Sequence, residues 1–318
     1  MLAVGFDVNG GPEVLRPVEL PVPEPGPGQV LIRVAYAGVN YGEMCHRLGD
    51  LGAPDGIDVP GYEVSGEVAA LGPGVTGLSC GDPVAAFLPD GGGYAEFAVA
   101  PAAFAYPLDG ISLRDGGGVA LSLTTAYGVL AGAARLAAGD SVLIHAAAGG
   151  VGSAAAQIAR ALGAAAVHGT VSTAAKAVYA KRFGYDAVHI RDGFTAHVAE
   201  LDVVLDPIGG PTRLASLSVL APFGRLAVYG DAARRPDLSL PVLPLRQQNR
   251  SLAGYDIADL SRRAPTLVRA HALAALSLLA TGAIRLDITA ELPLTSAPEA
   301  HETLQSGLNL GKSLLRVS

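Results

Sequence analysis

The sequence predicts an α/β protein in which a doubly wound parallel sheet of six strands is combined with a second, β-rich domain. Between residues 141 and 255, six apolar runs of strand length alternate with helical or loop segments, a pattern typical of a parallel sheet covered on both faces. Before residue 119, short strand-like runs are instead separated by Gly, Pro and Asp. A glycine-rich turn joins the first of the six strands to the helix that follows it.

Composition narrows the classes of protein to consider. The 318-residue chain has a formal net charge of −7, which disfavours a nucleic-acid partner because phosphate neutralisation needs clustered Lys and Arg. Its two cysteines, Cys45 and Cys80, form neither a disulfide framework nor a C-x-x-C pair. The start of the chain resembles no secretory signal. We therefore expect a soluble, cytoplasmic protein with no nucleic-acid or membrane partner.

The β-rich part is expected over residues 1–118. Partly alternating or apolar runs bounded by turn residues predict short strands, which suggest a small irregular barrel or sandwich. These runs lie at 29–40, 62–72, 82–87 and 94–100.

The α/β part follows, and its six strands match two mononucleotide-binding halves. The predicted strands are 141–145, 164–169, 187–190, 202–206, 225–230 and 250–255, with helices at 150–162 and 173–183.

An apolar helix is expected at 265–281. Arg269 and His271 interrupt this stretch, which indicates a buried helix of a soluble protein rather than a membrane span. The tail after it returns to strand-like pieces and is expected to rejoin the first domain. We thus expect one domain from 1–118 and 265–318, with the domain 119–264 inserted into it.

The turn within "SVLIHAAAGGVGSAAAQIARALG" (141–163) matches the dinucleotide-binding pattern of three small residues. Ala147, Gly149 and Gly152 occupy the G-x-G-x-x-G positions, with Ala replacing the first glycine. A small residue permits the tight turn, Gly149 lets the backbone approach a diphosphate, and Gly152 lets the helix pack on the strand. The expected binding residues of this Rossmann turn are Ala148, Gly149, Gly150, Val151 and Gly152. A turn that binds nothing, or one that binds FAD or an adenosyl cofactor, is the alternative.

The end of the second strand indicates which dinucleotide binds. NAD-preferring enzymes usually carry Asp or Glu there, but residues 167–186 contain no acidic residue before Asp186. Ser172 and Lys176 lie on the loop and first helical turn, where a cation attracts a 2′-phosphate. The sequence therefore predicts NADPH. In the alternative, Ser172 only caps the helix and Lys176 is solvated.

Several motifs together resemble the medium-chain dehydrogenase/reductase superfamily, specifically its zinc-independent quinone oxidoreductase and enoyl reductase branch. The resemblance runs nearly end to end and implies a GroES-like catalytic domain around a Rossmann domain. It is carried by "AGVNYGEM" (37–44), "PGYEVSGEVAALGPGV" (60–75), "GGYAEFAVAP" (92–101), "LTTAYGVL" (123–130), "HAAAGGVGSAAAQIARALGA" (145–164), "DVVLDPIGG" (202–210), "GRLAVYG" (224–230) and "AHETLQSGLNLGKSLLRV" (300–317).

The resemblance implies hydride transfer from NADPH to a quinone or to the β-carbon of an enone or enoyl thioester. Zinc-dependent relatives would carry Cys at Asn40 and His at Tyr62, and the seven histidines show no ligand spacing, so no metal is expected. Asn40 and Tyr62 are implied to lie beside the nicotinamide and to contact substrate, with Tyr41 as a third candidate. A structural role is the alternative for either tyrosine.

The resemblance leaves the proton donor of the reaction unassigned. Many quinone reductases carry Tyr at the position of Cys45, and enoyl reductases often carry Tyr near Leu51. Because this chain has neither tyrosine, water or an unassigned group would supply the proton. Asp206 is expected to be structural. The remaining implied cofactor residues are Thr125, Arg191, Tyr229, Gly230 and Asn309.

Two other functions remain open at this point. One is an enoyl reductase of a polyketide or other biosynthetic pathway, and the other is a non-catalytic NADPH-binding protein. The resemblance also suggests a homodimer formed through the edge strand of the nucleotide-binding sheet, near 245–255.

Overall fold

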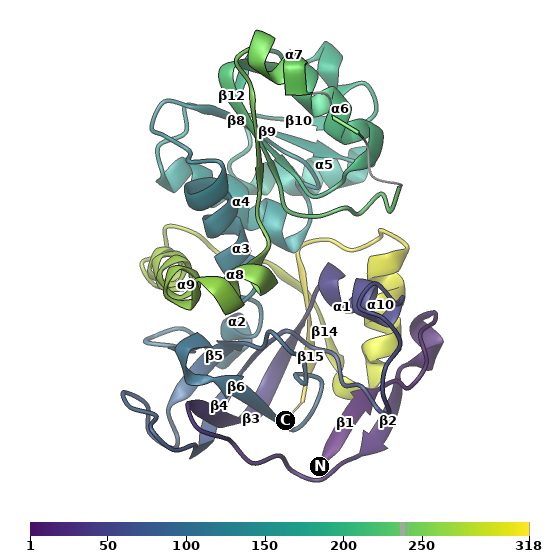
Figure 1. Ribbon diagram of the computed structural model, residues 1–318, viewed down its shortest axis with the longest axis vertical. Helices are drawn as coiled ribbons and strands as arrows, with labels where there is room; N and C mark the ends of the chain where they lie inside the picture. Colours follow the sequence, from purple (N-terminus) through teal and green to yellow (C-terminus); the bar gives the residue numbers. More distant parts are fainter. Residues whose placement is uncertain (236–238, 241, 318) are drawn as a thin grey trace. The chain divides into compact units, whose positions relative to one another are not determined.

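The computed structural model describes residues 1–235, 239–240 and 242–317 (Figure 1). The chain forms two compact units. Unit 1 contains residues 1–124, 260–280 and 286–318, and unit 2 contains residues 125–259 and 281–285. Unit 2 therefore interrupts unit 1 in the sequence.

Unit 2 is built on a six-stranded sheet in which every neighbouring pair is parallel. The strand order is β10-β9-β8-β11-β12-β13, which in chain order is the 3-2-1-4-5-6 arrangement of the Rossmann fold. The prediction of a doubly wound six-stranded sheet is therefore confirmed. The strands are β8 (Ser141–Ile144), β9 (Ala166–Val171), β10 (Ala187–Ile190), β11 (Leu201–Asp206), β12 (Leu220–Val228) and β13 (Ser251–Gly254).

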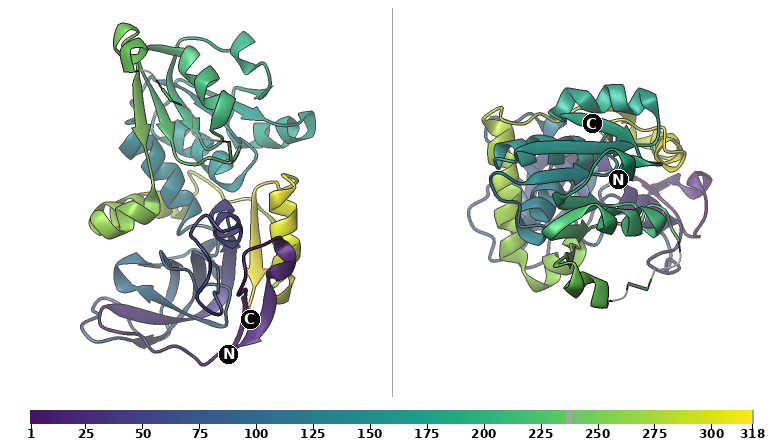
Figure 2. Two further views of the ribbon diagram at one scale, coloured as in Figure 1. Left: turned by 45° about the vertical axis from the view of Figure 1, so that its right-hand side comes forward. Right: turned by 90° about the horizontal axis from the view of Figure 1, so that it is seen from above.

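Helices lie on both sides of this sheet (Figure 2). They pack close to the strands that they connect: α4 on β8 and β9, α5 on β9 and β10, and α6 on β11 and β12. Leu143, Val204 and Leu226 from the central strands are fully buried beneath them. The helices of this unit are α4 (Gly150–Ala161), α5 (Ala174–Ala180), α6 (Gly210–Ser218) and α7 (Val242–Gln247), with the π-helix η3 (Gly128–Ala133) and the 3-10 helices η4 (Lys181–Phe183) and η5 (Phe194–Ala196).

Unit 1 is built on a seven-stranded, mostly antiparallel sheet. Its order is β14-β15-β3-β4-β5-β7, and β6 also pairs with β3. The four predicted strand runs correspond to β3, β4, β5 and β6, whereas β1, β2 and β7 were not predicted. The strands of this sheet are β3 (Gln29–Val39), β4 (Glu63–Leu71), β5 (Pro83–Phe87), β6 (Phe97–Pro101), β7 (Ala105–Pro107), β14 (Ile288–Pro293) and β15 (Lys312–Arg316). Strands β1 (Leu2–Gly5) and β2 (Arg16–Glu19) pair antiparallel in a separate two-stranded sheet.

The two ends of the chain meet in unit 1. Strand β15 pairs antiparallel with β3, with Leu315 opposite Ala37, and Figure 1 shows the yellow C-terminal strands in the same layer.

Helices complete the unit. They are α1 (Tyr41–Arg47), α2 (Leu113–Gly116), α9 (Pro265–Ala280) and α10 (Ala297–Gln305), with the 3-10 helices η1 (Pro12–Val14), η2 (Ala102–Phe104) and η6 (Leu294–Ser296); α3 (Ser122–Tyr127) and α8 (Ile257–Arg263) contain the unit boundaries.

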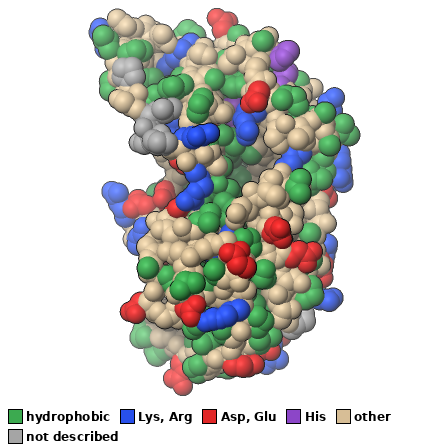
Figure 3. Space-filling view, turned by 90° about the vertical axis from the view of Figure 1, so that its right-hand side faces the viewer, with side chains coloured by type: hydrophobic (Ala, Val, Ile, Leu, Met, Phe, Trp, Pro, Cys, Tyr) green, Lys and Arg blue, Asp and Glu red, His purple; other side chains and the backbone are tan. Residues whose placement is uncertain are grey.

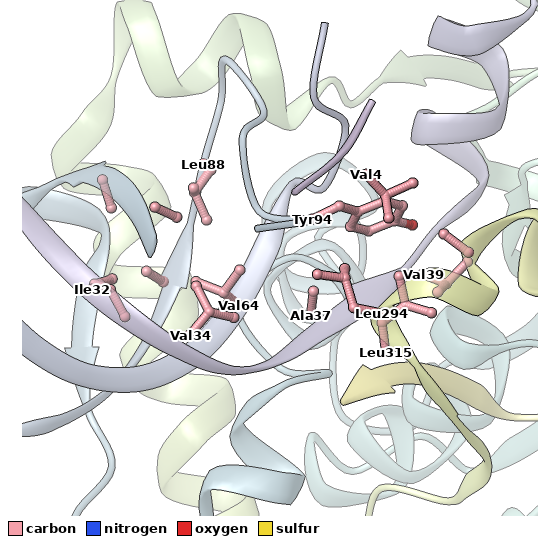
Figure 4. Close-up of a cluster of buried hydrophobic side chains, with 14 of the residues drawn as sticks. Val4, Ile32, Val34, Ala37, Val39, Val64, Leu88, Tyr94, Leu294 and Leu315 are labelled. Carbon is pink, nitrogen blue, oxygen red and sulfur yellow. The ribbon is translucent and has the colours of Figure 1, made fainter. Parts of the chain in front are cut away.

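The core of unit 1 joins both chain ends (Figure 4). Val4, Ile32 and Val64 from the first strands pack in one cluster with Leu294 and Leu315 from the tail. Each of these side chains is less than 5% exposed. Because burying one such aliphatic side chain contributes about 1.5–3 kcal/mol, the tail is an integral part of this core.

The predicted apolar helix is α9, which ends at Ala280. Across the described ranges, none of the helices is both long and apolar enough to cross a membrane. Acidic and basic side chains are interspersed on the face shown in Figure 3.

Candidate active site

The glycine turn connects β8 to the N-terminus of α4. Gly149 is the N-cap of the helix, and its N–H donates to the carbonyl of Ala146 at 2.9 Å. A Cβ on Gly152 would lie 2.3 Å from that same carbonyl oxygen, so only glycine fits there. This close approach of helix α4 to the turn explains why the third small residue of the dinucleotide pattern, Gly152, is a glycine.

Gly149 plays a different part in the turn. A Cβ at this position would lie 3.4 Å from the Ala146 oxygen and within 4 Å of nothing else. The backbone is therefore open on this side, where the first turn of a twelve-residue helix presents N–H groups without intrahelical partners. Binding of a diphosphate by the turn over Ala148–Gly152 stays a prediction, with which the open backbone at Gly149 is compatible.

Two cations lie near each other beyond the ends of β9 and β10. Lys176 is in the first turn of α5, and Arg191 directly follows β10. Burial lowers the pKa of Lys176, and the positive charge of Arg191 lowers it further. Two mutually repelling cations favour an anion between them. Thr173, not Ser172, is the N-cap of α5, so the alternative capping role for Ser172 is wrong. The Ser172 side chain is exposed.

Asp206 organises the loop after β11. Its buried carboxylate accepts hydrogen bonds from the N–H groups of Ile208 and Gly209 and from Nε of Arg213, all at 2.8–2.9 Å. Arg213 also donates to the carbonyl of Gly230. These bonds hold Gly230 and the neighbouring Tyr229 at the end of β12, and they give Asp206 the structural role expected of it.

A buried ion pair lies in unit 1 around Asn40. Nζ of Lys312 donates to Oδ1 of Asn40 at 2.6 Å and forms an ion pair with Glu63. Glu63 also accepts from the N–H of Leu121 at 2.8 Å, and Ser122 bonds both Asn40 and Glu63. A zinc-dependent relative would carry a cysteine ligand at the position of Asn40. In this chain the side-chain amide of Asn40 accepts a hydrogen bond from the ammonium group of Lys312.

Asn40 is also the N-cap of α1. Its backbone N–H donates to Glu43 at 2.9 Å and its side-chain amide donates to Glu43 at 3.1 Å. Burial raises the pKa of Glu43, and Lys312 opposes that rise. Both the oxygen and the nitrogen of the Asn40 side-chain amide are therefore hydrogen-bonded, which fixes the orientation of the amide. A contact between Asn40 and substrate stays a prediction.

Tyr62 belongs to a hydrogen-bonded chain that sequence reasoning missed. Its hydroxyl lies 3.0 Å from Nδ1 of His46, and Nε2 of His46 lies 2.8 Å from Oδ2 of Asp58. Burial raises the pKa of Tyr62, and the nearby charge of Glu43 raises it further. The sequence gives no signal for this grouping, because the three residues are brought together by a loop of irregular structure.

The other predicted residues lie at separate positions. Tyr41 is the first residue of α1, Thr125 is buried on α3, and Asn309 lies half-buried between α10 and β15. Among the described residues, no group of three or more His, Cys, Asp or Glu side chains is placed to hold a metal ion.

Two family models match the chain. The model of the alcohol dehydrogenase GroES-like domain matches residues 26–110, and the model described as zinc-binding dehydrogenase matches residues 150–272. The first match lies within unit 1, and the second begins at α4 and continues into α9.

Curated and solved proteins resemble the chain over most of its length. It is 31% identical over 305 residues to a mycocerosic acid synthase-like polyketide synthase of Mycobacterium tuberculosis, which covers 92% of this chain but only 14% of that protein. The chain also resembles the solved structure of Escherichia coli quinone oxidoreductase complexed with NADPH. The match covers 100% of each chain, with a TM-score of 0.91 and 28% sequence identity.

One relative matches in both length and sequence. A quinone oxidoreductase of Pseudomonas aeruginosa is 33% identical over 322 residues, which is 98% of each chain. Together with the two family models and the matching fold, this similarity shows that the chain belongs to the medium-chain dehydrogenase/reductase superfamily, in its quinone oxidoreductase branch.

Proposed function

We propose that the protein is an NADPH-dependent oxidoreductase that transfers a hydride to a quinone or to the β-carbon of an α,β-unsaturated carbonyl compound. The observation that carries this proposal is the bare glycine turn at the N-terminus of α4, with Lys176 and Arg191 near each other beyond the neighbouring strands. The NADPH complex of the similar E. coli enzyme supports it.

The coenzyme would be held by unit 2. The N–H groups of Ala148–Gly152 would bind the diphosphate, and Lys176, Arg191 and Ser172 would bind the phosphate on the adenosine ribose. The further cofactor contacts that we propose are Thr125, Tyr229, Gly230 and Asn309. NADPH supplies the hydride when it is bound.

The acceptor would be contacted by unit 1. Reduction of an enone at its β-carbon moves charge onto the carbonyl oxygen, and hydrogen-bond donors stabilise that charge. We propose Tyr41 and Tyr62 as groups that contact the acceptor. Asn40 would contribute through its fixed amide, whose orientation the ammonium of Lys312 and the carboxylate of Glu43 maintain.

A second candidate function is enoyl reduction in a biosynthetic pathway. The similarity of 92% of this chain to one section of a polyketide synthase favours it. Reduction of an enone and of an enoyl thioester involves the same hydride transfer to a β-carbon, so the two candidates differ in the acceptor and not in the coenzyme.

An acceptor screen tests the proposal. Oxidation of NADPH by the purified protein would be followed by absorbance with quinones, simple enones and an enoyl thioester. We expect turnover with at least one of these classes, and preference for the enoyl thioester would identify the second candidate. Tight NADPH binding without turnover on any acceptor would instead indicate a non-catalytic NADPH-binding protein.

We also propose that the protein is a homodimer that works in the cytoplasm. Strand β13 is the outer strand of the six-stranded sheet, and Leu252 on it is 42% exposed, so a second copy can pair along this edge. Cys45 and Cys80 are not joined in a disulfide, which is the usual state of cysteines in a reducing compartment.

A further inference from the structure

Three side chains of unit 1 form a continuous chain of hydrogen bonds from a phenol to a carboxylate. Tyr62 Oη and His46 Nδ1 are 3.0 Å apart, and His46 Nε2 and Asp58 Oδ2 are 2.8 Å apart. The His46 side chain is 13% exposed and that of Asp58 is 28% exposed. The chain therefore leads from a half-buried hydroxyl to a group in contact with water.

Packing holds the phenol and the imidazole in place. A Cβ on Gly42 would lie 3.3 Å from the Tyr62 ring, and a Cβ on Gly91 would lie 3.8 Å from it. The edge of Phe6 packs against the His46 ring, with centroids 5.5 Å apart. The His46 and Tyr62 rings are themselves stacked, with centroids 6.2 Å apart and an interplanar angle of 18°, so the hydroxyl has a defined orientation relative to Nδ1.

We propose that Tyr62 is the general acid that protonates the α-carbon of the reduced acceptor, that His46 returns a proton to Tyr62, and that Asp58 positions the His46 ring through its contact with Nε2. This inference rests on the proposed function. It names the donor that the sequence leaves unassigned, since neither Cys45 nor Leu51 supplies the tyrosine that related enzymes carry.

The step balances in atoms and electrons. The β-carbon accepts the hydride, and the π electrons of the carbon–carbon double bond move towards the carbonyl oxygen to give an enolate. The enolate α-carbon then forms a bond to the Tyr62 proton, and the O–H electron pair stays on the phenol oxygen. That oxygen takes the Nδ1 proton of the His46 imidazolium, and water returns a proton to the imidazole. The sum is one hydride and one proton added to the acceptor.

The surroundings of Tyr62 explain why a partner is needed. Burial raises the pKa of its hydroxyl, and the charges of Glu43, Asp58, Cys45 and Asp90 raise it further. A free phenolate is therefore costly, so the proton must be replaced as it leaves. Asp58 accepts Nε2–H from His46, and in the imidazolium form Nδ1–H donates to Tyr62, which leaves the phenol proton free for the substrate.

The test compares an enone with a quinone in D₂O. The enone is 2-methylcyclohex-2-enone, whose α-carbon becomes a stereocentre when it is protonated. A hydroquinone receives its protons on oxygen and exchanges them with water, so it does not need this acid. The variants are Tyr62→Phe, His46→Ala and Asp58→Asn, with Tyr36→Phe as a matched tyrosine control elsewhere in the unit.

For Tyr62→Phe we expect kcat on the enone to fall about 100-fold, the size of a general-acid contribution, with KM little changed. Deuterium should then enter both faces of the α-carbon, whereas the wild type labels one face. The loss of kcat on the quinone should be much smaller than on the enone, because the quinone receives its protons on oxygen, and the thermal midpoint should stay close to wild type. His46→Ala should lose about tenfold on the enone and regain activity with added imidazole. Asp58→Asn should show a smaller loss of the same kind.

Different results would overturn different claims. Unchanged enone turnover and one-face labelling in Tyr62→Phe would overturn the inference and leave the proposed function standing. An equal loss on enone and quinone would also overturn it, since that pattern indicates a general binding or structural role. No turnover of either acceptor by the wild type would remove the proposed function itself, and turnover of the quinone alone would remove only the inference.

Discussion

Nζ of Lys312 donates a hydrogen bond to Oδ1 of Asn40 at 2.6 Å, although the two residues are 272 positions apart in the sequence. The same ammonium forms an ion pair with Glu63, and both charged side chains are almost fully buried. One strand from the end of the chain thus supplies the positive charge that neutralises a carboxylate near its beginning.

Removing that charge should destabilise the protein strongly. In Lys312→Met, Glu63 would be left buried without its ion-pair partner, and breaking a buried pair costs about 3–5 kcal/mol. Urea unfolding would measure the loss. The double variant Lys312→Met/Glu63→Gln should recover part of it, and Lys181→Met, at an exposed lysine, is the control. A loss below about 1 kcal/mol would contradict this account of the pair.

The two glycines of the turn should respond differently to the same substitution. Gly152→Ala places a Cβ 2.3 Å from the Ala146 carbonyl oxygen, so we expect lower stability as well as lost coenzyme binding. In Gly149→Ala the Cβ enters open space at the helix N-terminus, so the protein should fold normally but bind the coenzyme poorly. Thermal midpoints and fluorescence titration separate the two effects. Full coenzyme affinity in Gly149→Ala would argue against the cradle.

Lys176 and Arg191 should determine the choice of coenzyme. Lys176→Ala and Arg191→Ala are each expected to weaken NADPH binding about tenfold, since a charge-assisted hydrogen bond to phosphate is worth about 1.5 kcal/mol or more. NADH lacks the 2′-phosphate, so its affinity should change little. Titration of each variant with both coenzymes gives the comparison, with Lys181→Ala as the control. Equal losses for both coenzymes would show that these cations do not bind the extra phosphate.

His145 should make stability depend on pH. Its Nδ1 lies 2.6 Å from Thr170 Oγ1 and its Nε2 lies 2.8 Å from Ser216 Oγ, and burial lowers its pKa from 6.5 to about 4. The unfolded chain binds a proton near pH 6.5 whereas the folded chain binds it only near pH 4, so stability is lost as pH falls through this window. At pH 5 the loss is about 2 kcal/mol.

The measurement is the free energy of unfolding at pH 7 and pH 5. The drop between the two should be about 2 kcal/mol smaller in His145→Gln than in wild type, whatever the variant's stability at pH 7. An identical pH dependence in wild type and His145→Gln would contradict the lowered pKa.

The edge strand β13 should mediate dimerisation. Leu252→Asp places a charge on the proposed interface and should convert a dimer to a monomer in sedimentation experiments, because pairing would bury that carboxylate. Leu273 on α9 has the same 42% exposure, so Leu273→Asp is a matched control that should stay dimeric. A wild-type monomer at working concentrations would refute the proposed assembly.

The fold of unit 2 was predictable because its signals are local. Each strand is an apolar run, and the glycine turn fixes where the first helix begins, so the six strands appeared with boundary errors of a few residues. Strand β2 was missed because its four residues, RPVE, include a proline and no alternating apolar face. Thr173 and Ser172 are adjacent residues with the same capping chemistry, and only the backbone conformation distinguishes them.

The contacts of the candidate site were less predictable because they join distant segments. Asn40 was chosen from its matching position, but nothing in its neighbourhood indicates Lys312 as its partner. The role of His46 could not be predicted, since sequence spacing does not reveal that a loop returns Tyr62 and Asp58 to its ring. Pairings of this kind depend on tertiary packing and not on periodicity.

The pairing of β15 with β3 has a consequence for synthesis on the ribosome. The sheet of unit 2 is complete once residue 254 has emerged, so this unit can fold while translation continues. Strand β3 emerges much earlier, but the edge that β15 covers must remain unsatisfied until residues 312–316 leave the exit tunnel. A nascent chain stalled before that point would expose the unpaired edge of β3, and we expect chaperones to bind there.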